Sequence, residues 1–393
     1  MNKKHIAFIL AFMILFSGCS GLPNKTPLEE IQAILIVGLD TKDDQVDLTV
    51  LSVGSKPGAE SNKGGESIKV YESSGRTVYE AKQKMSLYHD KHMIWAHLEY
   101  IIIGDEAARS GIAEHLDFFI RNHENRLSDE LVVAKDMTAR EFIKNVNTSE
   151  PKMNEKIRHL FSEVEVESVT KIVHLREWAL KYQSDTMSII LPVMGTTNKM
   201  RSEDSKKEES SPKKDIRSAG YAIFNREGKM IDYASLRFSR GINWVMDKIE
   251  SAVVVLDLGE HEILSTEITS AKTKLEINED ATELDVNINL LFNIPEYTGK
   301  EDLYDAVYIA DVKQELEQII ENEVKDTMTY LQTLNTDVTN IGDVYYHKYP
   351  GNWKFMQDQW ANKFKDIKVN VVVRSTLRNT YNIVNPMRKR GYV

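Results

Sequence analysis

The sequence AKTKLEINEDATELDVNINLLFN at residues 271–293 determines the fold class that we expect for the second half of this 393-residue chain. Apolar and polar residues alternate on both sides of the turn sequence NEDAT (278–282), which is typical of two antiparallel strands with one buried face. The segment 303–334 then repeats apolar residues every three or four positions and predicts one long amphipathic helix. We therefore expect a C-terminal α+β domain at 259–380, an antiparallel sheet covered by a long helix.

The first half of the chain has a different pattern, in which strands alternate with helices. Uninterrupted or alternating apolar runs predict strands, and apolar residues at helical spacing predict helices. The predicted strands are at 33–38, 46–50, 95–104 and 131–134, and the predicted helices are at 77–88 and 136–145. This alternation predicts an N-terminal α/β domain at 28–198.

A polar stretch at 199–215 (KMRSEDSKKEESSPKKD) separates the two patterns. It contains one apolar residue, Met200, and charges of both signs, so it cannot repay the entropy lost on folding. We interpret it as a flexible linker or exposed loop and as the best candidate for a domain boundary. The following segment, 216–258, opens with a hairpin pattern and could belong to a separate domain. The whole chain is thus predicted to be a multidomain α+β protein with a mixed α/β body.

The N-terminus has the order of features found in a secretory signal. Lys3 and Lys4 precede an apolar run at 6–16, and the small residues Ser17 and Gly18 then precede Cys19. Eleven apolar residues span about 16 Å as a helix, roughly half of a hydrocarbon core, so the run is too short to cross a bilayer. We predict a signal peptide at 1–18.

Cys19 is the only cysteine of the chain, and its position resembles a bacterial lipobox, in which the thiol receives a diacylglyceryl group. The alternative is an ordinary signal peptide that happens to be followed by a cysteine. We predict lipidation of Cys19 and a polar tether at 19–27 that connects the anchor to the folded body. A residue carrying two or more acyl chains holds a protein stably at a bilayer, whereas one chain is marginal.

Composition excludes several classes of protein. The chain has 60 acidic and 50 basic residues, a net charge of -10, which argues against nucleic acid as a partner. One cysteine excludes an internal disulfide framework and a cysteine-based metal site. No stretch of about 20 apolar residues is present, so no permanent membrane span is expected.

Searches for catalytic and metal motifs give no assignment. His123–Glu124 and His261–Glu262 lack the second histidine of a zinc protease, and neither a nucleophile elbow nor a P-loop is present. Two clusters each have a functional and a plainer interpretation. The histidines His89, His92 and His97 could form a metal site or be polar loop residues. The aspartates Asp40, Asp43 and Asp44 could form a calcium site or be turn residues. We favour the plainer interpretation of both, and predict no catalytic residue, metal site or cofactor.

Two further features allow a binding role. Trp353 and Trp360 lie seven residues apart on one predicted helical face and could form a partner surface, although such residues more often pack a helix onto a sheet. The predicted tail at 381–393 carries Arg388, Lys389 and Arg390, which could contact lipid headgroups or simply be solvated.

Several segments, in order along residues 28–380, resemble the Ger(x)C family of spore germination lipoproteins, the C subunits of nutrient germinant receptors. The segments are GRTVYEA (75–81), WAH (95–97) leading into IIIG (101–104), LDFF (116–119) followed by Arg121 and Arg126, GYAIF (220–224), and the closing set Tyr349, Pro350, Trp353, Trp360, Phe364 and 369–377. Family members often carry Trp-Asp after the lipid cysteine, whereas this chain has Ser20 and Gly21.

The resemblance implies an elongated, three-domain mixed α/β body without enzymatic activity. It implies a location on the outer face of the spore inner membrane, with a lipid on Cys19 as the anchor. The implied partners are two integral membrane receptor subunits, one of them permease-like, in a receptor that triggers germination. Two other classes remain as alternatives: a solute-binding lipoprotein of a transporter, which needs two similar lobes and a hinge, and a surface hydrolase, which the motif searches disfavour.

Overall fold

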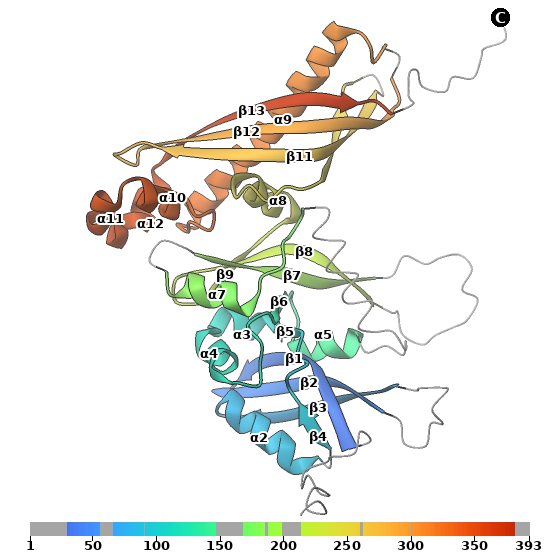
Figure 1. Ribbon diagram of the computed structural model, residues 1–393, viewed down its shortest axis with the longest axis vertical. Coiled ribbons are helices and arrows are strands. Elements are labelled where there is room, and N and C mark those ends of the chain that lie inside the picture. The colour runs from blue at the N-terminus through green and yellow to red at the C-terminus, as the bar shows by residue number, and fades with distance from the viewer. Residues whose placement is uncertain are drawn as a thin grey trace, which may run out of the picture.

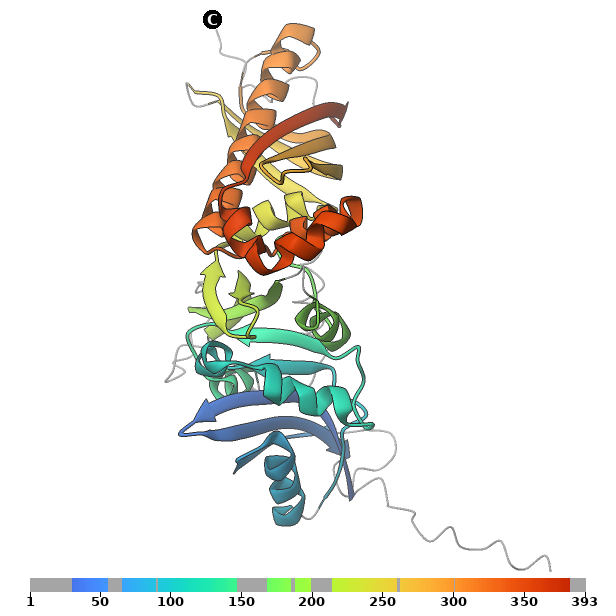
Figure 2. The ribbon, with the colours of Figure 1, turned by 90° about the vertical axis from the view of Figure 1, so that its left-hand side faces the viewer.

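The computed structural model describes residues 30–55, 66–89, 91–146, 168–184, 188–198, 214–259, 262–299 and 301–381. Within these residues a nine-stranded and a four-stranded sheet follow one another along the long axis of an elongated body, as Figure 1 and Figure 2 show. The predicted signal peptide at 1–18, the tether at 19–27 and the tail beyond Tyr381 lie outside the described residues.

The larger sheet is mixed. Hairpins join its outer strands in antiparallel pairs, whereas β1, β5, β6 and β7 are parallel neighbours because helices connect them. In order across the sheet its strands are β3 (Glu66–Gly75), β2 (Gln45–Ser55), β1 (Ile31–Lys42), β5 (Tyr100–Ile103), β6 (Glu130–Ala134), β7 (Ile189–Asn198), β8 (Lys214–Phe224) and β9 (Met230–Ala234), and β4 (His92–Ile94) also pairs with β1.

Helices cover both faces of this sheet. One face packs against α2 (Val78–Tyr88), α3 (Asp105–Ser110), α4 (Ala113–Arg121) and α7 (Leu175–Tyr182). The other face packs against α5 (Ala139–Val146), through Ala139, Phe142 and Ile143. The predicted N-terminal strands and helices are present, although the strand expected at 95–104 is confined to β5 (Tyr100–Ile103).

The sheet continues across the stretch 199–215, where we predicted a domain boundary. Strands β7 and β8 on either side of it are antiparallel neighbours, paired from Ile189 with Phe224 to Asn198 with Lys214. The stretch therefore connects adjacent strands of one sheet; residues 199–213 lie outside the described residues. The predicted hairpin of β8 and β9 is confirmed, and it completes the first sheet.

Helix α8 (Leu236–Val245) lies between the two sheets (Figure 1). Its Ile242, Trp244 and Val245 belong to one continuous apolar core together with residues of β7, β8 and the second sheet. Ser235 fixes the start of α8, because the Ser235 hydroxyl accepts a hydrogen bond from the Phe238 N–H.

The second sheet has the order β10 (Ala252–Asp257), β11 (Ile263–Ile277), β12 (Glu283–Tyr297) and β13 (Lys368–Asn379). The pair β11–β12 is antiparallel as predicted, but β12 and β13 are parallel. The prediction of a fully antiparallel sheet was therefore wrong for its last strand. Between β12 and β13 the chain crosses the sheet through four α-helices and one 3-10 helix, and such a crossover returns it in its original direction.

Helix α9 (Ala306–Thr333) covers the second sheet along most of its length (Figure 2). The Asp305 side chain accepts a hydrogen bond from the Val307 N–H and begins the helix. All six apolar residues of its predicted stripe are buried: Val312, Leu316, Ile320, Val324, Met328 and Leu331. The chain then forms α10 (Ile341–Lys348), α11 (Pro350–Met356), the 3-10 helix η3 (Gln357–Gln359) and α12 (Trp360–Lys365).

Candidate functional site

The predicted lipidation residue, Cys19, lies outside the described residues, so its modification stays a prediction. No helix among the described residues is long and apolar enough to span a bilayer. Clefts and several buried polar groups are the remaining places where the described part of the chain could act.

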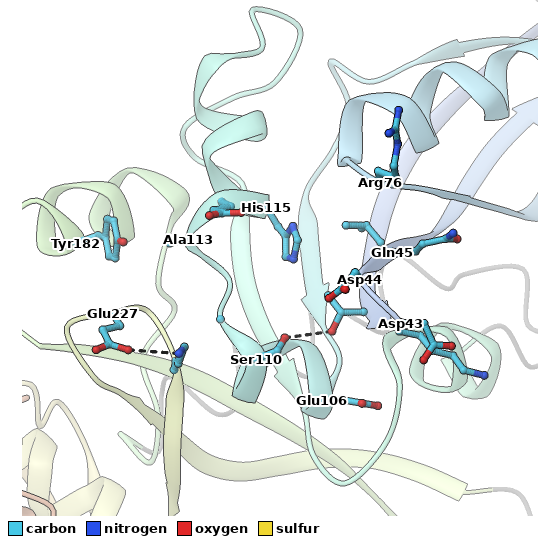
Figure 3. A pocket seen from close by; sticks show the side chains of 16 residues that line it. Asp43, Asp44, Gln45, Arg76, Glu106, Ser110, Ala113, His115, Tyr182 and Glu227 are labelled. Carbon is cyan, nitrogen blue, oxygen red and sulfur yellow. Dashed lines mark hydrogen bonds and ion pairs between the residues drawn. The ribbon is translucent and has the colours of Figure 1, made fainter.

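The first cleft lies where segments that are distant in sequence meet, and it has a volume of about 550 Å³. Figure 3 shows Asp43 and Asp44 from the β1–β2 turn, Ser110 and His115 from α3 and α4, and Glu227 from the β8–β9 turn around it. Its lining is mostly polar and carries both charge signs, so it offers no single-sign field to attract an ion.

Ser110, His115 and Glu227 of this cleft are each hydrogen-bonded, ion-paired or electrically neutral. The Ser110 hydroxyl bonds to the Ala107 carbonyl at 3.0 Å and lies 3.2 Å from the Thr41 hydroxyl (Figure 3). Burial lowers the pKa of His115, so its imidazole is neutral at neutral pH. Glu227 is paired with Lys229 at 3.4 Å. The cleft thus has the character of a polar surface recess.

The second cleft, of about 740 Å³, adjoins helix α2. Its floor holds Lys82, whose side chain is 10% exposed and whose Nζ lies 2.8 Å from Glu124 Oε2. The same ammonium lies over the rings of Trp95 and Phe118, at 4.9 and 5.9 Å from their centroids. In the sequence, Lys82 is a charged residue on the apolar face of the predicted helix at 77–88, next to Ala81, and this position is the signal that marks it.

The histidine cluster does not assemble into a site. His89 packs against the Tyr71 ring with centroids 4.3 Å apart, His92 lies in β4, and His97 is exposed. Among the described residues, no group of three or more histidine, cysteine, aspartate or glutamate side chains is placed to hold a metal ion.

The three aspartates have structural roles. Asp43 and Asp44 form the two-residue turn between β1 and β2 with φ of 49° and 59°, a conformation that aspartate tolerates and that this hairpin turn requires. Asp40 is buried and accepts hydrogen bonds from the N–H groups of Ala139 and Arg140, at 2.7 and 3.0 Å. The turn interpretation is confirmed for Asp43 and Asp44, and Asp40 instead binds the start of α5.

Trp353 and Trp360 are both buried and pack against Tyr345. The packing interpretation is therefore confirmed over that of a partner surface. The Trp360 indole N–H donates to Asp337 Oδ2 at 3.0 Å, and the same oxygen accepts from the Gly342 N–H at 2.7 Å. Burial raises the pKa of Asp337, while these donors oppose the rise. This cluster joins α10 to α12 and is structural.

One buried acid was not noticed in the sequence. Asp129, just before β6, is 1% exposed, and its Oδ2 has no hydrogen-bond partner among the described residues. Burial raises its pKa to about 7. Only the folded chain creates this environment, because the sequence around Asp129 is an ordinary polar loop.

Comparisons with known proteins assign the chain to a family. A family described as "Spore germination protein N-terminal domain" matches residues 24–196, and one described as "Spore germination B3/ GerAC like, C-terminal" matches residues 219–381. The chain belongs to the Ger(x)C family of spore germination proteins. The resemblance in the sequence segments is thereby confirmed.

Relatives of the Ger(x)C family match nearly the whole chain. Spore germination protein KC of Bacillus subtilis (strain 168) is 24% identical over 96% of this chain and 98% of its own length. Spore germination protein YndF of the same organism is 22% identical over 86% of this chain and 82% of its own length.

A solved Ger(x)C structure has the same fold. The crystal structure of the GerBC protein matches with a TM-score of 0.56 and 18% identity, over 87% of this chain and 96% of that chain. This likeness confirms the predicted mixed α/β class and the C-terminal sheet with its covering helix.

Proposed function

We propose that this Ger(x)C protein is the lipid-anchored C subunit of a spore nutrient germinant receptor. It would sit on the outer face of the spore inner membrane, with the lipid on Cys19, and act beside two integral membrane subunits, one of them permease-like. The observation that carries the proposal is the match of both family descriptions, in order, to residues 24–196 and 219–381.

The chemistry of the chain supports a binding and assembly role. The clefts contain side chains that bond to one another, such as Lys82 with Glu124 and Glu227 with Lys229. The descriptions of the family and of its relatives name germination and no catalytic activity. An anchor would raise the effective concentration of the body beside membrane partners, which increases the occupancy of a weak complex without any new contact.

A transporter-linked solute-binding lipoprotein is less well supported. Such proteins close two similar lobes about a hinge. In this chain the two sheets differ: one is mixed with nine strands, and the other has four strands under a 28-residue helix. A thermal-shift screen of the mature Cys19→Ala chain with amino acids and sugars tests this alternative, because a tightly bound solute raises the melting temperature.

The decisive experiment changes Cys19 in a spore-forming host. Cys19→Ala should leave the body folded, move it from the membrane to the soluble fraction, and abolish nutrient-triggered germination. Ser20→Ala is the matched control, since it alters the neighbouring residue and keeps the thiol. Normal membrane partitioning and normal germination of the Cys19→Ala strain would contradict the proposal.

A further inference from the structure

The first described strand, β1, begins at one end of the molecule. Strand β1 starts at Ile31, and Ile31 pairs in parallel with His92 of β4. Helix α2 ends at Tyr88, four residues before His92. The last turn of α2 and the start of β1 therefore lie at the same end of the body, the lower end in Figure 1 and Figure 2. We call this the entry end, defined by Ile31, Leu87, Tyr88 and His92.

The entry end exposes two large apolar side chains side by side. Leu87 is 79% exposed and Tyr88 is 78% exposed, in the last turn of α2. The buried face of this helix uses Val78, Ala81, Lys82 and Met85 instead. An exposed leucine next to an exposed tyrosine combines an apolar anchor with an amphipathic ring, the pair of residue types that favours the boundary between water and lipid.

The segment around the last turn of α2 is less acidic than the chain as a whole, although Glu80 pairs with its Lys84 at 2.9 Å and Glu30 precedes Ile31. The segment 84–92 (KMSLYHDKH) has two lysines and one aspartate, a net charge of +1 with its two histidines counted as neutral, whereas the whole chain carries -10. A locally basic segment is attracted to anionic lipid, while the acidic remainder is repelled by it.

The length of chain before Ile31 limits how far the entry end can lie from an anchor. Ten residues, 20–29, separate Cys19 from the first described residue, Glu30. A fully extended chain of ten residues spans about 35 Å at most. A lipid on Cys19 would thus keep Leu87 and Tyr88 within reach of the same bilayer.

We propose that Leu87 and Tyr88 insert into the headgroup region of the bilayer that holds the lipid of Cys19. This inference rests on the proposed lipid anchor and adds a second attachment point to it. One tether leaves the orientation of the body free, whereas a tether and an inserted helix end together fix it. The long axis then points away from the membrane, and the entry end meets membrane-embedded partners first.

The test replaces the biological anchor, so that it does not depend on lipidation of Cys19. The mature chain from Ser20 receives a hexahistidine tag at its start and binds vesicles that contain a nickel-chelating lipid and anionic phospholipid. Because Cys19 is the only cysteine of the chain, Leu87→Cys in this background carries a single environment-sensitive fluorophore. Lipids with a spin label in the headgroup region serve as the quencher.

The matched control is Val307→Cys, at an apolar residue that is 71% exposed in the first turn of α9, at the opposite end of the molecule (Figure 1). We expect vesicle binding to shift the emission of the label at position 87 to the blue and to make it quenchable, and to leave the label at position 307 unchanged. Vesicles of neutral phospholipid with the same chelating lipid should give a weaker response at position 87.

A label at position 87 that behaves like the one at position 307, on a chain that is bound through its tag, would overturn the proposal. Protection of position 87 from thiol reagents only when the membrane subunits are present would assign the surface to a protein partner and would also overturn it. The Cys19→Ala experiment in spores reports on the lipid anchor separately, so the two failures can be told apart.

Discussion

Arg240 of α8 and Glu323 of α9 form a two-point ion pair, with Nε 2.7 Å from Oε1 and Nη2 2.5 Å from Oε2. The Glu323 side chain is 3% exposed, and its hydrogen bonds raise the pKa of the Arg240 guanidinium. Arg240 Nη1 also donates to the carbonyl of Val253 on the edge strand β10, at 3.1 Å. One arginine thus joins the helix between the sheets, the long covering helix and the edge of the second sheet.

Removal of the negative charge from this pair should destabilise the protein strongly. Glu323→Gln leaves the largely buried guanidinium without its counter-charge, and we expect a loss of about 2–4 kcal/mol in the free energy of unfolding. Denaturant titration measures the loss. Lys325→Gln, which removes the 43% exposed partner of Glu321 in the same helix, is the control and should cost less than about 0.5 kcal/mol.

A double-variant cycle separates the charge effect from packing. Arg240→Met with Glu323→Leu removes both charges and should cost less than the sum of the two single changes, because neither partner is left unpaired. Additive losses would mean that the two side chains act independently.

The crossing of α8 over α9 depends on a glycine. A Cβ atom on Gly241 would lie 1.9 Å from Thr327 Oγ1 and 2.7 Å from Thr327 Cβ, so the two helix backbones approach closely only without it. Gly241→Ala should lower the melting temperature although alanine favours helices. Gly351→Ala in α11 is the control, since its Cβ would meet nothing within 4 Å. An unchanged or raised melting temperature for Gly241→Ala would show that α8 moves freely.

The elements that the sequence predicted well are those with long, regular periodicity. The stripe of α9 from Val312 to Leu331 and the alternation of β11 and β12 repeat often enough that a shift by one residue would expose the whole apolar set. The features that it did not predict depend on long-range geometry. The direction of β13 follows from the crossover before it, and the pairing of β7 with β8 spans a stretch whose composition resembles a linker.

The candidate site residues also divide into those that a local motif indicates and those that depend on contacts distant in sequence. Cys19 is recognised from its immediate neighbours, so a local motif is enough to propose its role. The ion pair of Lys82 with Glu124 joins residues 42 positions apart, and the bond from Ala139 to Asp40 joins residues 99 positions apart. No local pattern encodes such partners. An exposed pair such as Leu87 and Tyr88 becomes conspicuous only when the packed face of its helix is seen to use other residues.

Asp40 should contribute to stability as the cap of α5. Its carboxylate accepts hydrogen bonds from the first two helical N–H groups, in addition to the reciprocal bonds between Thr138 and Glu141. Asp40→Ala should cost about 1–2 kcal/mol, measured by denaturant titration. Asp44→Gly in the adjacent turn is the control and should cost nothing, because its φ of 59° suits glycine. Equal stability of both variants would contradict a capping role.

Asp129 should make stability depend on pH. Burial raises its pKa in the folded protein to about 7, from an ordinary value near 3.8. Between these two values the folded chain binds a proton that the unfolded chain has released, so this contribution to stability falls as pH rises and is lost above about 7. Asp129→Asn stays neutral at every pH. We therefore expect the melting temperature of the variant, relative to the natural protein, to increase from about pH 5 to pH 8.

The matched control for this series is Asp358→Asn, at an exposed aspartate of η3. We expect its melting temperature relative to the natural protein to stay constant over the same range of pH, because this side chain is exposed to solvent. A difference between Asp129→Asn and the natural protein that stays constant or decreases with pH would mean that the carboxylate is ionised at little cost in the fold. In that case water or a cation would have to reach Oδ2.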